Sequence, residues 1–425
     1  MRFSLGAAAT VLLASRAAAK AVYAHYMLGG VTPSHAQIDV DQAKALGIDA
    51  FAVNIGETSA SWALNALEGL FAAAQKSNFK LFISMDFYQQ HDINAFTKLA
   101  QKYVGNSAYL RIDNRPVIST FSMGGYTVDQ IKSWTWKSLA DVVYFIPNAD
   151  TAPGYNDPST FVRNWADAVD GFFGWESAWP SGGRQPANVS SSVDSAVMRA
   201  AHGVSKTYMA PLSSLQFKAC CGGHYYRIGE VNLPQRMQQL VDLQPDMVEV
   251  LTWNDAGESH YIGNNWPETL TNNPEITAYS SNQVWPHTAW QPLIQSFITA
   301  YKGNDRFAPV KGASASGAMW YRTVLTTANC NKPSAWQSAR DSVNYAIIFG
   351  DDVSNTKIRV TTDGHVLSEV AAKPGLNYAA VDGMRLGAQK VEVVKNGAVT
   401  LKATSTANVD NNSDCYFNYK VVGFK

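Results

Sequence analysis

The stretch Met247-Val-Glu-Val-Leu-Thr-Trp253 decides the fold class of this chain of 425 residues. It is a short and nearly continuous apolar run, which is typical of a strand in a parallel sheet that helices cover on both faces. Further runs of the same kind precede it along the chain: Val22–Leu28, Ala50–Ile55, Leu81–Phe87, Pro116–Phe121, Val142–Ile146, Ala168–Trp175 and Thr207–Pro211. Met247–Trp253 is therefore the last of eight expected strands.

Amphipathic segments separate these runs and predict helices. The helix expected over Ala36–Leu46 ends at Gly47, and those over Ser61–Lys76 and Asn94–Tyr103 also end shortly before the next strand. Eight repeats in about 280 residues match a (β/α)8 TIM barrel, which we expect over residues 20–303. A doubly wound α/β sheet is the competing fold, but it usually has fewer strands, and no Gly-x-Gly-x-x-Gly turn follows the first strand.

The sequence changes in character after Lys302-Gly303. Turn signals such as Asp363-Gly364 and Asn396-Gly397 separate short alternating runs. The runs are Ala318–Thr326, Ser342–Phe349, Lys357–Thr362, Gly364–Glu369, Lys390–Lys395, Val399–Thr404 and Tyr416–Val422. They predict a C-terminal all-β sandwich domain over residues 304–425.

The N-terminus predicts export. Arg2, the apolar run Leu5–Ala14 and the small residues Ala17 and Ala19 form a signal peptide over residues 1–19. The apolar run is too short for the alternative, a membrane anchor, which needs about 20 residues. We therefore expect a secreted monomer, extracellular or associated with a cell wall, and no membrane partner.

The charge balance and the cysteines narrow the function further. Lys plus Arg and Asp plus Glu number 34 each, so nucleic acid is not an expected partner. The four cysteines favour disulfides over metal ligation in an oxidising compartment, with Cys330–Cys415 as the first pair. The adjacent Cys220 and Cys221 either form a vicinal disulfide with each other or each form a disulfide with another cysteine. Asn188 and Asn411 begin glycosylation sequons.

Polar and aromatic residues follow the expected strands, and in a barrel the carboxyl ends of the strands form the active site. With 12 Trp in the chain, some of these rings are expected to grip sugars, whereas others pack in the core. The candidates for substrate contact at the strand ends are His25, Tyr26, Asn54, Tyr88, Asn148, Trp175, Glu176, Trp253, Asn254 and His260.

Carboxylates at this edge indicate a glycosidase. Asp255 and Glu258 follow the eighth strand, and glycosidases use one protonated and one ionised carboxyl group. Asp86 ends the third strand among apolar neighbours, where burial raises the pKa of a carboxyl group. Two structural alternatives remain open: a helix capping box for Asp255 and Glu258, and a buried carboxylate bonded to backbone amides for Asp86.

The loop Phe217–Arg227 brings His224, Tyr225, Tyr226 and Arg227 to the same rim, either as a substrate wall or as an exposed loop that disulfides stabilise. The sequence contains no His-Glu-x-x-His, Cys-x-x-Cys, phosphate loop or Gly-x-Ser-x-Gly motif. His25, His224 and His260 could be imagined as metal ligands, but no spacing motif supports this, so neither a metal nor a cofactor is expected.

Three segments carry a family resemblance: Tyr23-Ala-His-Tyr-Met27, Gly47-Ile-Asp-Ala-Phe-Ala-Val-Asn54 and Leu251-Thr-Trp-Asn-Asp-Ala-Gly-Glu-Ser259. They resemble the fungal α-1,3-glucanases (mutanases) of glycoside hydrolase family 71. The resemblance covers the whole barrel and extends less sharply into the C-terminal region. One departure is Ala256, where the family often has Phe or Tyr.

The resemblance implies endo-type hydrolysis of α-1,3-glucan with inversion, a catalytic pair of Asp255 and Glu258, and Asp86 as an essential neighbour. We assign Glu258 as general acid and Asp255 as general base, although the roles could be exchanged. Such a pair lies about 6.5–9.5 Å apart in inverting enzymes. The alternative function is a non-catalytic, lectin-like cell-wall protein; transfer of glucan chains is disfavoured because it usually needs a retaining enzyme.

Overall fold

The computed structural model describes residues 20–139, 142–271, 273–411 and 414–425, so the expected signal peptide lies outside the described residues. Each of the eight expected runs overlaps a strand of one parallel sheet. The strands are β1 (Ala21–Met27), β2 (Ala50–Ile55), β3 (Lys80–Asp86), β5 (Arg115–Phe121), β6 (Tyr144–Pro147), β7 (Gly171–Phe173), β8 (Thr207–Ser213) and β11 (Met247–Leu251).

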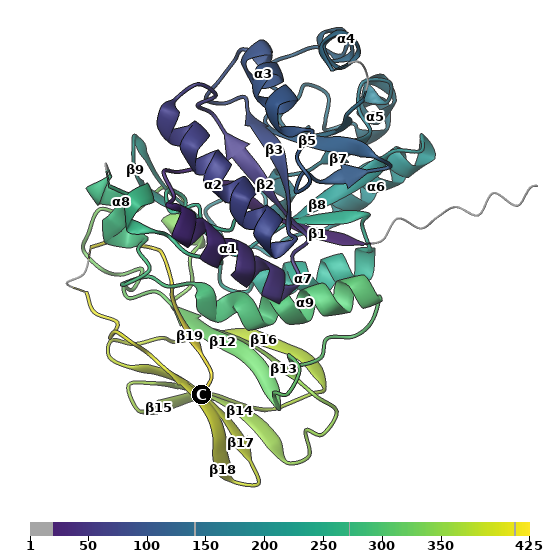
Figure 1. Ribbon diagram of the computed structural model, residues 1–425. Coiled ribbons are helices and arrows are strands. Elements are labelled where there is room, and N and C mark those ends of the chain that lie inside the picture. Colours follow the sequence, from purple (N-terminus) through teal and green to yellow (C-terminus); the bar gives the residue numbers. More distant parts are fainter. Residues whose placement is uncertain (1–19, 140–141, 272, 412–413) are drawn as a thin grey trace, which may run out of the picture.

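The sheet is curled, and its strands follow the order of the chain. The order is β6-β5-β3-β2-β1-β11-β8-β7, so the last strand pairs in parallel with the first. An isolated parallel bridge between Asn148 and Phe173 brings the two ends of this path, β6 and β7, together. The Ala149 N–H also donates to the Phe173 carbonyl oxygen, at 3.0 Å. The fold is thus mixed α/β with a curled parallel sheet (Figure 1).

The helices lie around this sheet (Figure 1), and local signals explain where they begin and end. Helix α1 begins after Thr32, whose side chain accepts from the His35 N–H, and ends at Gly47, whose φ of 91° suits glycine. The helices are α1 (Pro33–Leu46), α2 (Ser61–Ser77), α3 (Ile93–Tyr103), α4 (Val128–Ser138), α5 (Pro158–Trp165), α6 (Ser192–Gly203), α7 (Asn232–Leu243), α8 (Pro274–Tyr279) and α9 (Gln291–Gly303).

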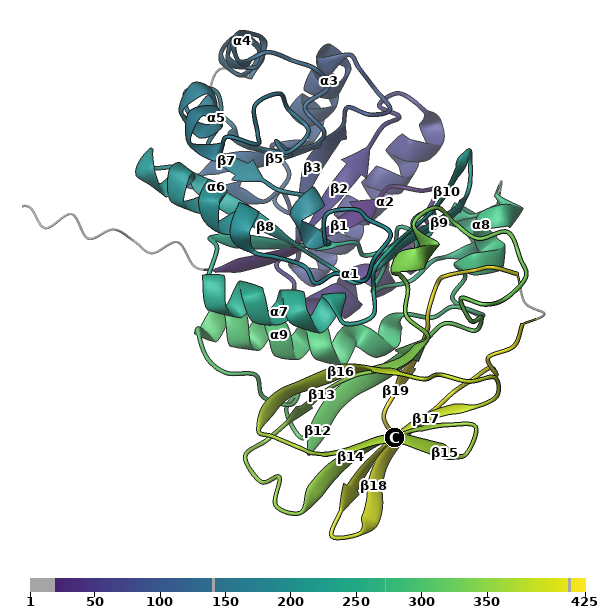
Figure 2. The same cartoon turned by 180° about the vertical axis from the view of Figure 1, so that it is seen from behind.

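The segment expected as the loop Phe217–Arg227 is a β-hairpin. Its strands are β9 (Gln216–Cys220) and β10 (Gly223–Arg227), which pair antiparallel. The hairpin contacts the C-terminal region, since the Tyr226 N–H donates to the Ser334 carbonyl oxygen at 3.0 Å. A short additional strand, β4 (Arg111–Ile112), pairs antiparallel with β5. Figure 2 shows the hairpin beside α8.

The C-terminal region consists of two four-stranded antiparallel sheets, with orders β16-β13-β12-β19 and β15-β14-β17-β18. Apolar side chains of both sheets, such as Ile347 and Val391, belong to one hydrophobic cluster. The sequence did not predict β16. The strands are β12 (Ala315–Tyr321), β13 (Ser342–Phe349), β14 (Thr356–Thr362), β15 (His365–Ala371), β16 (Gly375–Asp382), β17 (Gln389–Lys395), β18 (Ala398–Thr404) and β19 (Lys420–Gly423).

Packing is continuous between the parallel sheet and the C-terminal sheets. Helix α9 runs between them in both views (Figures 1 and 2). The rings of Trp290 and Trp320 lie 5.8 Å apart, and the Trp320 indole N–H donates to the Glu230 carbonyl oxygen at 2.8 Å. The two regions therefore share buried contacts. Among the described residues, no helix combines the length and apolar character needed to cross a bilayer.

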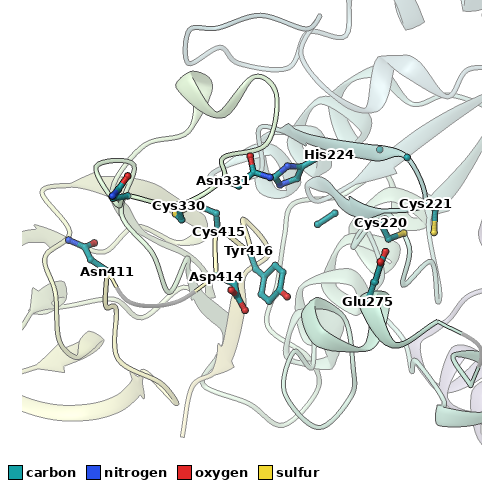
Figure 3. Close-up of a pocket in the computed structure, with 14 residues that line it drawn as sticks. Cys220, Cys221, His224, Glu275, Cys330, Asn331, Asn411, Asp414, Cys415 and Tyr416 are labelled. Carbon is teal, nitrogen blue, oxygen red and sulfur yellow. A yellow bond between two sulfur atoms is a disulfide. The ribbon is translucent and has the colours of Figure 1, made fainter.

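The cysteines differ from each other in state. Cys330 and Cys415 form a disulfide, the pair that the sequence placed first. Cys220 and Cys221 are free thiols, so the expectation that they also form disulfides is wrong for this structure. Cys220 ends β9 and is buried, whereas Cys221 lies in the turn and is exposed. All four line one polar pocket (Figure 3).

Candidate active site

A cavity of about 690 Å³ lies at the carboxyl ends of the strands and brings together the three predicted acids, Asp86, Asp255 and Glu258. Asp86 ends β3, whereas Asp255 and Glu258 lie in the segment that follows β11. The carboxyl ends of parallel strands meet at one edge of the sheet, so residues far apart in the sequence become neighbours.

Asp255 is held from several sides. Its backbone N–H donates to the Thr252 hydroxyl oxygen at 2.8 Å, and its Oδ1 accepts from the Glu258 N–H at 2.9 Å. Its Oδ2 lies 3.2 Å from His260 Nε2. Burial favours the protonated form, but the hydrogen bond and positive charge of His260, the Glu258 N–H and the charge of Lys218 together hold the pKa of Asp255 below its usual value. Asp255 is therefore an ionised carboxylate at neutral pH.

Glu258 points toward the hairpin. Its Oε1 accepts from the Tyr225 hydroxyl at 2.8 Å, and its Oε2 accepts from the Gln216 side-chain amide. Lys218 Nζ lies 3.9 Å from Oε1. Because the side chain contacts the hairpin and not the backbone N–H of Asp255, the two acids do not form a capping box, and no helix begins at Asp255.

His260 connects the two acids. Its Nε2 also lies 3.5 Å from Glu258 Oε2, and its ring is fully buried beside Trp179, at a centroid distance of 5.6 Å. One oxygen of each carboxylate and one His260 nitrogen lie within 4.8 Å of one another. This spacing of Asp255 and Glu258 is shorter than the about 6.5–9.5 Å expected for an inverting pair.

Carboxylate and imidazole groups such as those of Asp255, Glu258 and His260 can also bind a metal ion. Their ligand atoms are close enough to hold an ion. However, the oxygens of Glu258 already accept from Tyr225 and Gln216, and Lys218 places a positive charge beside them. These contacts stabilise the carboxylate without an ion, so the donor set fits a hydrogen-bonded acid pair better than a cation site.

Asp86 has features of both roles that the sequence left open, a carboxylate of the active site and a structural carboxylate bonded to backbone amides. Its Oδ1 accepts from the backbone N–H groups of Tyr88 and Gln89, at 3.0 and 3.2 Å, as a structural carboxylate would. It also lines the cavity. Burial raises the pKa of Asp86, although the two backbone N–H groups, the charge of His25 and the Asn54 side chain oppose this effect. Asp86 therefore holds its proton more tightly than Asp255 does.

An aromatic wall and an ion pair complete the cavity. The Trp175 ring makes edge contacts with His25 and Phe121, at centroid distances of 4.9 and 4.7 Å. Arg227 donates to Glu176 at 2.9 Å on the same wall. Among the residues expected to contact substrate, the cavity is lined by His25, Asn54, Tyr88, Trp175, Glu176 and Tyr225.

Five of the other expected contacts lie off the cavity wall, and for Tyr26 the reason is that side chains alternate along a strand. Tyr26 follows His25 but points outward, where its hydroxyl donates to Asp39 of α1 at 3.0 Å. Trp253 packs against Phe51 in the core. Asn148 and Asn254 are buried and bond to neighbouring backbone groups, and His260 contacts the acids from behind.

His224 belongs to a different pocket. It alternates with Tyr225 along β10 and therefore faces the second, polar pocket, which has a volume of about 810 Å³ (Figure 3). That pocket lies between the hairpin and the segment around Tyr416. The expectation that His224 and Tyr225 share one rim site is therefore wrong.

Sequence reasoning placed Arg227 near the rim but missed two cavity residues on the hairpin, Gln216 and Lys218. Gln216, Lys218 and Arg227 line the cavity with Tyr225. Lys218 pairs with Tyr225 across the hairpin, and Gln216 pairs with Arg227, so all four share one face. The alternation Gln-x-Lys and Tyr-x-Arg around Gly222-Gly223 was a readable hairpin signal. The buried Glu249 on β11 was also missed.

An open cavity with three carboxylates and an aromatic wall, at the carboxyl edge of a curled parallel sheet, is the arrangement of a glycoside hydrolase. Comparison with known families identifies the glycoside hydrolase family. Residues 18–425 match the family model described as glycosyl hydrolase family 71, and the chain belongs to this family. The family resemblance is confirmed, and the alternative of a non-catalytic wall protein is not supported.

Curated relatives agree with this assignment, and a solved structure has a similar fold. A mutanase from Penicillium rubens is 28% identical over 96% of this chain and 89% of its own length. A glucan endo-1,3-alpha-glucosidase from Schizosaccharomyces pombe is also 28% identical, over 94% of this chain and 93% of its own length. A GH99 endo-alpha-mannosidase from Bacteroides thetaiotaomicron is similar in structure, with a TM-score of 0.51, 8% identity, and coverage of 66% of this chain and 97% of its own. At that identity the similarity concerns the fold alone.

Proposed function

We propose that this protein is a secreted hydrolase that cleaves α-1,3-glucosidic bonds within α-1,3-glucan. The observation that carries the proposal is the placement of Asp255 and Glu258 on one wall of the cavity, each held by a separate set of neighbours. Two relatives that match this chain over nearly their full length are named mutanase and glucan endo-1,3-alpha-glucosidase.

The proposed roles follow from the environments of the two acids. Asp255, whose pKa lies below its usual value, accepts the proton of the attacking water as general base. Glu258 gives its proton to the glycosidic oxygen as general acid, and the Tyr225 hydroxyl then stabilises the carboxylate that forms. Asp86 and His25, which line the same cavity, bind sugar hydroxyls.

Inversion is proposed from the family resemblance, and the spacing of the two acids is the observation that speaks against it. An inverting enzyme needs room for a water between base and sugar, and the spacing within 4.8 Å leaves little. The anomer formed first decides the question. Inversion at an α-linkage releases the β-anomer, whereas retention releases the α-anomer and would make one of the two acids a nucleophile.

The architecture that we propose for this activity is a (β/α)8 barrel over residues 20–303 and a β-sandwich over residues 304–425. The isolated bridge between Asn148 and Phe173 supports a closed barrel, and the hydrophobic cluster shared by the two antiparallel sheets supports the sandwich. We also propose removal of residues 1–19 during export, a monomeric state, and action on extracellular or cell-wall glucan.

The test is release of reducing ends from insoluble α-1,3-glucan by Glu258→Gln and Asp255→Asn, with anomers followed by proton NMR. Both variants should lose activity by at least about 10²-fold and keep the fold. Glu275→Gln on α8 is the matched control, because Glu275 is exposed and does not line this cavity. Wild-type activity of both variants would refute the assignment, and accumulation of glucose as the first product would refute endo action.

A further inference from the structure

A buried histidine–glutamate pair lies at the back of the cavity. His25 on β1 and Glu249 on β11 are both fully buried, and His25 Nδ1 lies 2.7 Å from Glu249 Oε1. The two strands pair in parallel, with Tyr23 opposite Glu249 and Ala24 opposite Val250. Glu249 therefore points to the same face of the sheet as His25, toward the inside of the curl.

The other ring nitrogen of His25 has no protein partner. Nε2 is buried and makes no hydrogen bond to any residue that the structure describes, and His25 lines the cavity together with Asp86. The Trp175 ring contacts the imidazole edge-on at 4.9 Å, so the ring is fixed by two neighbours. A buried, unpaired polar atom is costly unless a ligand satisfies it. This cost indicates that Nε2 is directed at a group that arrives with the substrate.

Glu249 also makes fewer hydrogen bonds than a buried structural carboxylate needs. Its Oε2 has no hydrogen-bond partner among the described residues, and a buried carboxylate with a single partner contributes little to stability. Burial raises the pKa of Glu249, and the hydrogen bond and charge of His25 oppose this effect. The contact with His25 is therefore the interaction that compensates for burying this acid.

We propose that Glu249 is a positioning residue that orients His25 and keeps its Nε2 available for a hydrogen bond with a substrate hydroxyl in the catalytic cavity. The inference rests on the proposed glucan hydrolysis and adds to it a residue that does not touch substrate. The contact between the carboxylate of Glu249 and Nδ1 fixes the direction of the ring and leaves Nε2 as the nitrogen that is free to meet substrate.

Kinetics of three variants test the proposal: Glu249→Gln, His25→Gln and the double variant. Glu249→Gln should lower kcat by about 10–100-fold, with KM changed by less than about threefold, as expected when the partner of an orienting histidine is lost. The double variant should be no less active than His25→Gln, because Glu249 acts through His25. Additive losses, or a wild-type kcat for Glu249→Gln, would overturn the proposal.

Glu230→Gln is the matched control for folding. Glu230 is also a buried glutamate, but it accepts from the Tyr226 hydroxyl and the Arg340 N–H and does not line the cavity. We expect it to lower the melting temperature and to leave kcat unchanged. If Glu249→Gln loses activity only in proportion to its melting temperature, the role is structural and the proposal is wrong.

A readout without substrate separates this inference from the proposed function. In wild-type protein, the Nδ1 proton should appear as a downfield proton NMR signal that is absent in His25→Gln and displaced in Glu249→Gln. If the wild type releases no reducing ends from α-1,3-glucan but shows this signal, the proposed substrate is wrong, whereas the orienting contact between Glu249 and His25 is supported. If the signal is the same in Glu249→Gln, the orienting contact itself is refuted.

Discussion

His260 Nε2 lies 3.2 Å from Asp255 Oδ2, and the histidine ring is fully buried while the carboxylate faces the cavity. The histidine approaches from the side opposite to the sugar site, so it can hold Asp255 without blocking it. Its charge and hydrogen bond oppose the effect of burial on Asp255 and leave the pKa of this acid below its usual value. The proposed base is therefore ready to accept a proton in weakly acidic medium.

The variant His260→Phe tests this relationship. It keeps a ring in the buried site but removes the hydrogen bond and the charge, so burial then dominates and the pKa of Asp255 rises. We expect the acid limb of the pH profile of kcat/KM to move to higher pH, with activity partly recovered as the pH is raised. His35→Phe is the control, since His35 stacks on Trp266 away from the cavity. If the acid limb of the kcat/KM profile is unchanged in His260→Phe, Asp255 is not the general base.

Two neighbouring tyrosines on β10 should respond oppositely to loss of the hydroxyl group. Tyr225→Phe removes a donor to Glu258, and a hydrogen bond to a charged group contributes about 1.5–3 kcal/mol, so kcat should fall by about 10–100-fold at an unchanged melting temperature. Tyr226→Phe removes buried bonds to Glu230 and Tyr419, so stability should fall while kcat is kept. Steady-state kinetics and thermal unfolding of both variants check the prediction. A Tyr225→Phe variant that loses stability but keeps its kcat would contradict it.

The strands of the parallel sheet could be predicted because their apolar runs are buried on both sides. Every expected run from Val22–Leu28 to Met247–Trp253 overlaps its strand. The hairpin Gln216–Arg227 was missed because it has no continuous apolar run, although its polar and aromatic residues alternate around a glycine turn. Strand β16 (Gly375–Asp382) was missed for a similar reason: much of it is only partly buried, so its apolar pattern is weak.

The acids of the site could be predicted, but only some of their neighbours could. Asp86, Asp255 and Glu258 follow apolar strands, and a position at a strand end is visible in the sequence. Whether a residue faces the cavity depends on the direction of each side chain, which separates His25 from Tyr26. Gln216 and Lys218 reach Glu258 only because the hairpin folds back over the cavity, which is a long-range contact that no local pattern records.

The Cys330–Cys415 disulfide should contribute to stability. It joins residues 85 positions apart, and closing a loop of this size in the unfolded chain stabilises the folded state by about 2–5 kcal/mol. Cys330→Ala with Cys415→Ala should lower the free energy of unfolding by that amount in urea denaturation. Cys220→Ala with Cys221→Ala should not show a comparable loss, because both thiols are free. Equal losses in the two double variants would show that Cys220 and Cys221 are also oxidised in the protein.

His287 should make the protein sensitive to acid. The ring is fully buried, stacks on Tyr261, and lies 3.2 Å from the Tyr419 carbonyl oxygen of the C-terminal region. Burial lowers the pKa of His287 to about 3, although the two backbone contacts oppose this effect, and the charge of Lys420 lowers it further.

The direction of this pH dependence follows from the pKa in each state. In the unfolded chain the histidine binds a proton near its usual pKa of about 6.5, whereas the folded protein excludes that proton until about pH 3. The free energy of unfolding should therefore fall as the pH drops below about 6.5, and this residue should account for about 2–3 kcal/mol of the loss by pH 4.5. Urea denaturation at pH 6.5 and 4.5 measures the loss, and His287→Gln, which does not titrate, should reduce it. His202→Gln is the control because His202 is largely exposed; if both variants lose as much stability as the wild type between these pH values, His287 is not the acid-sensitive group.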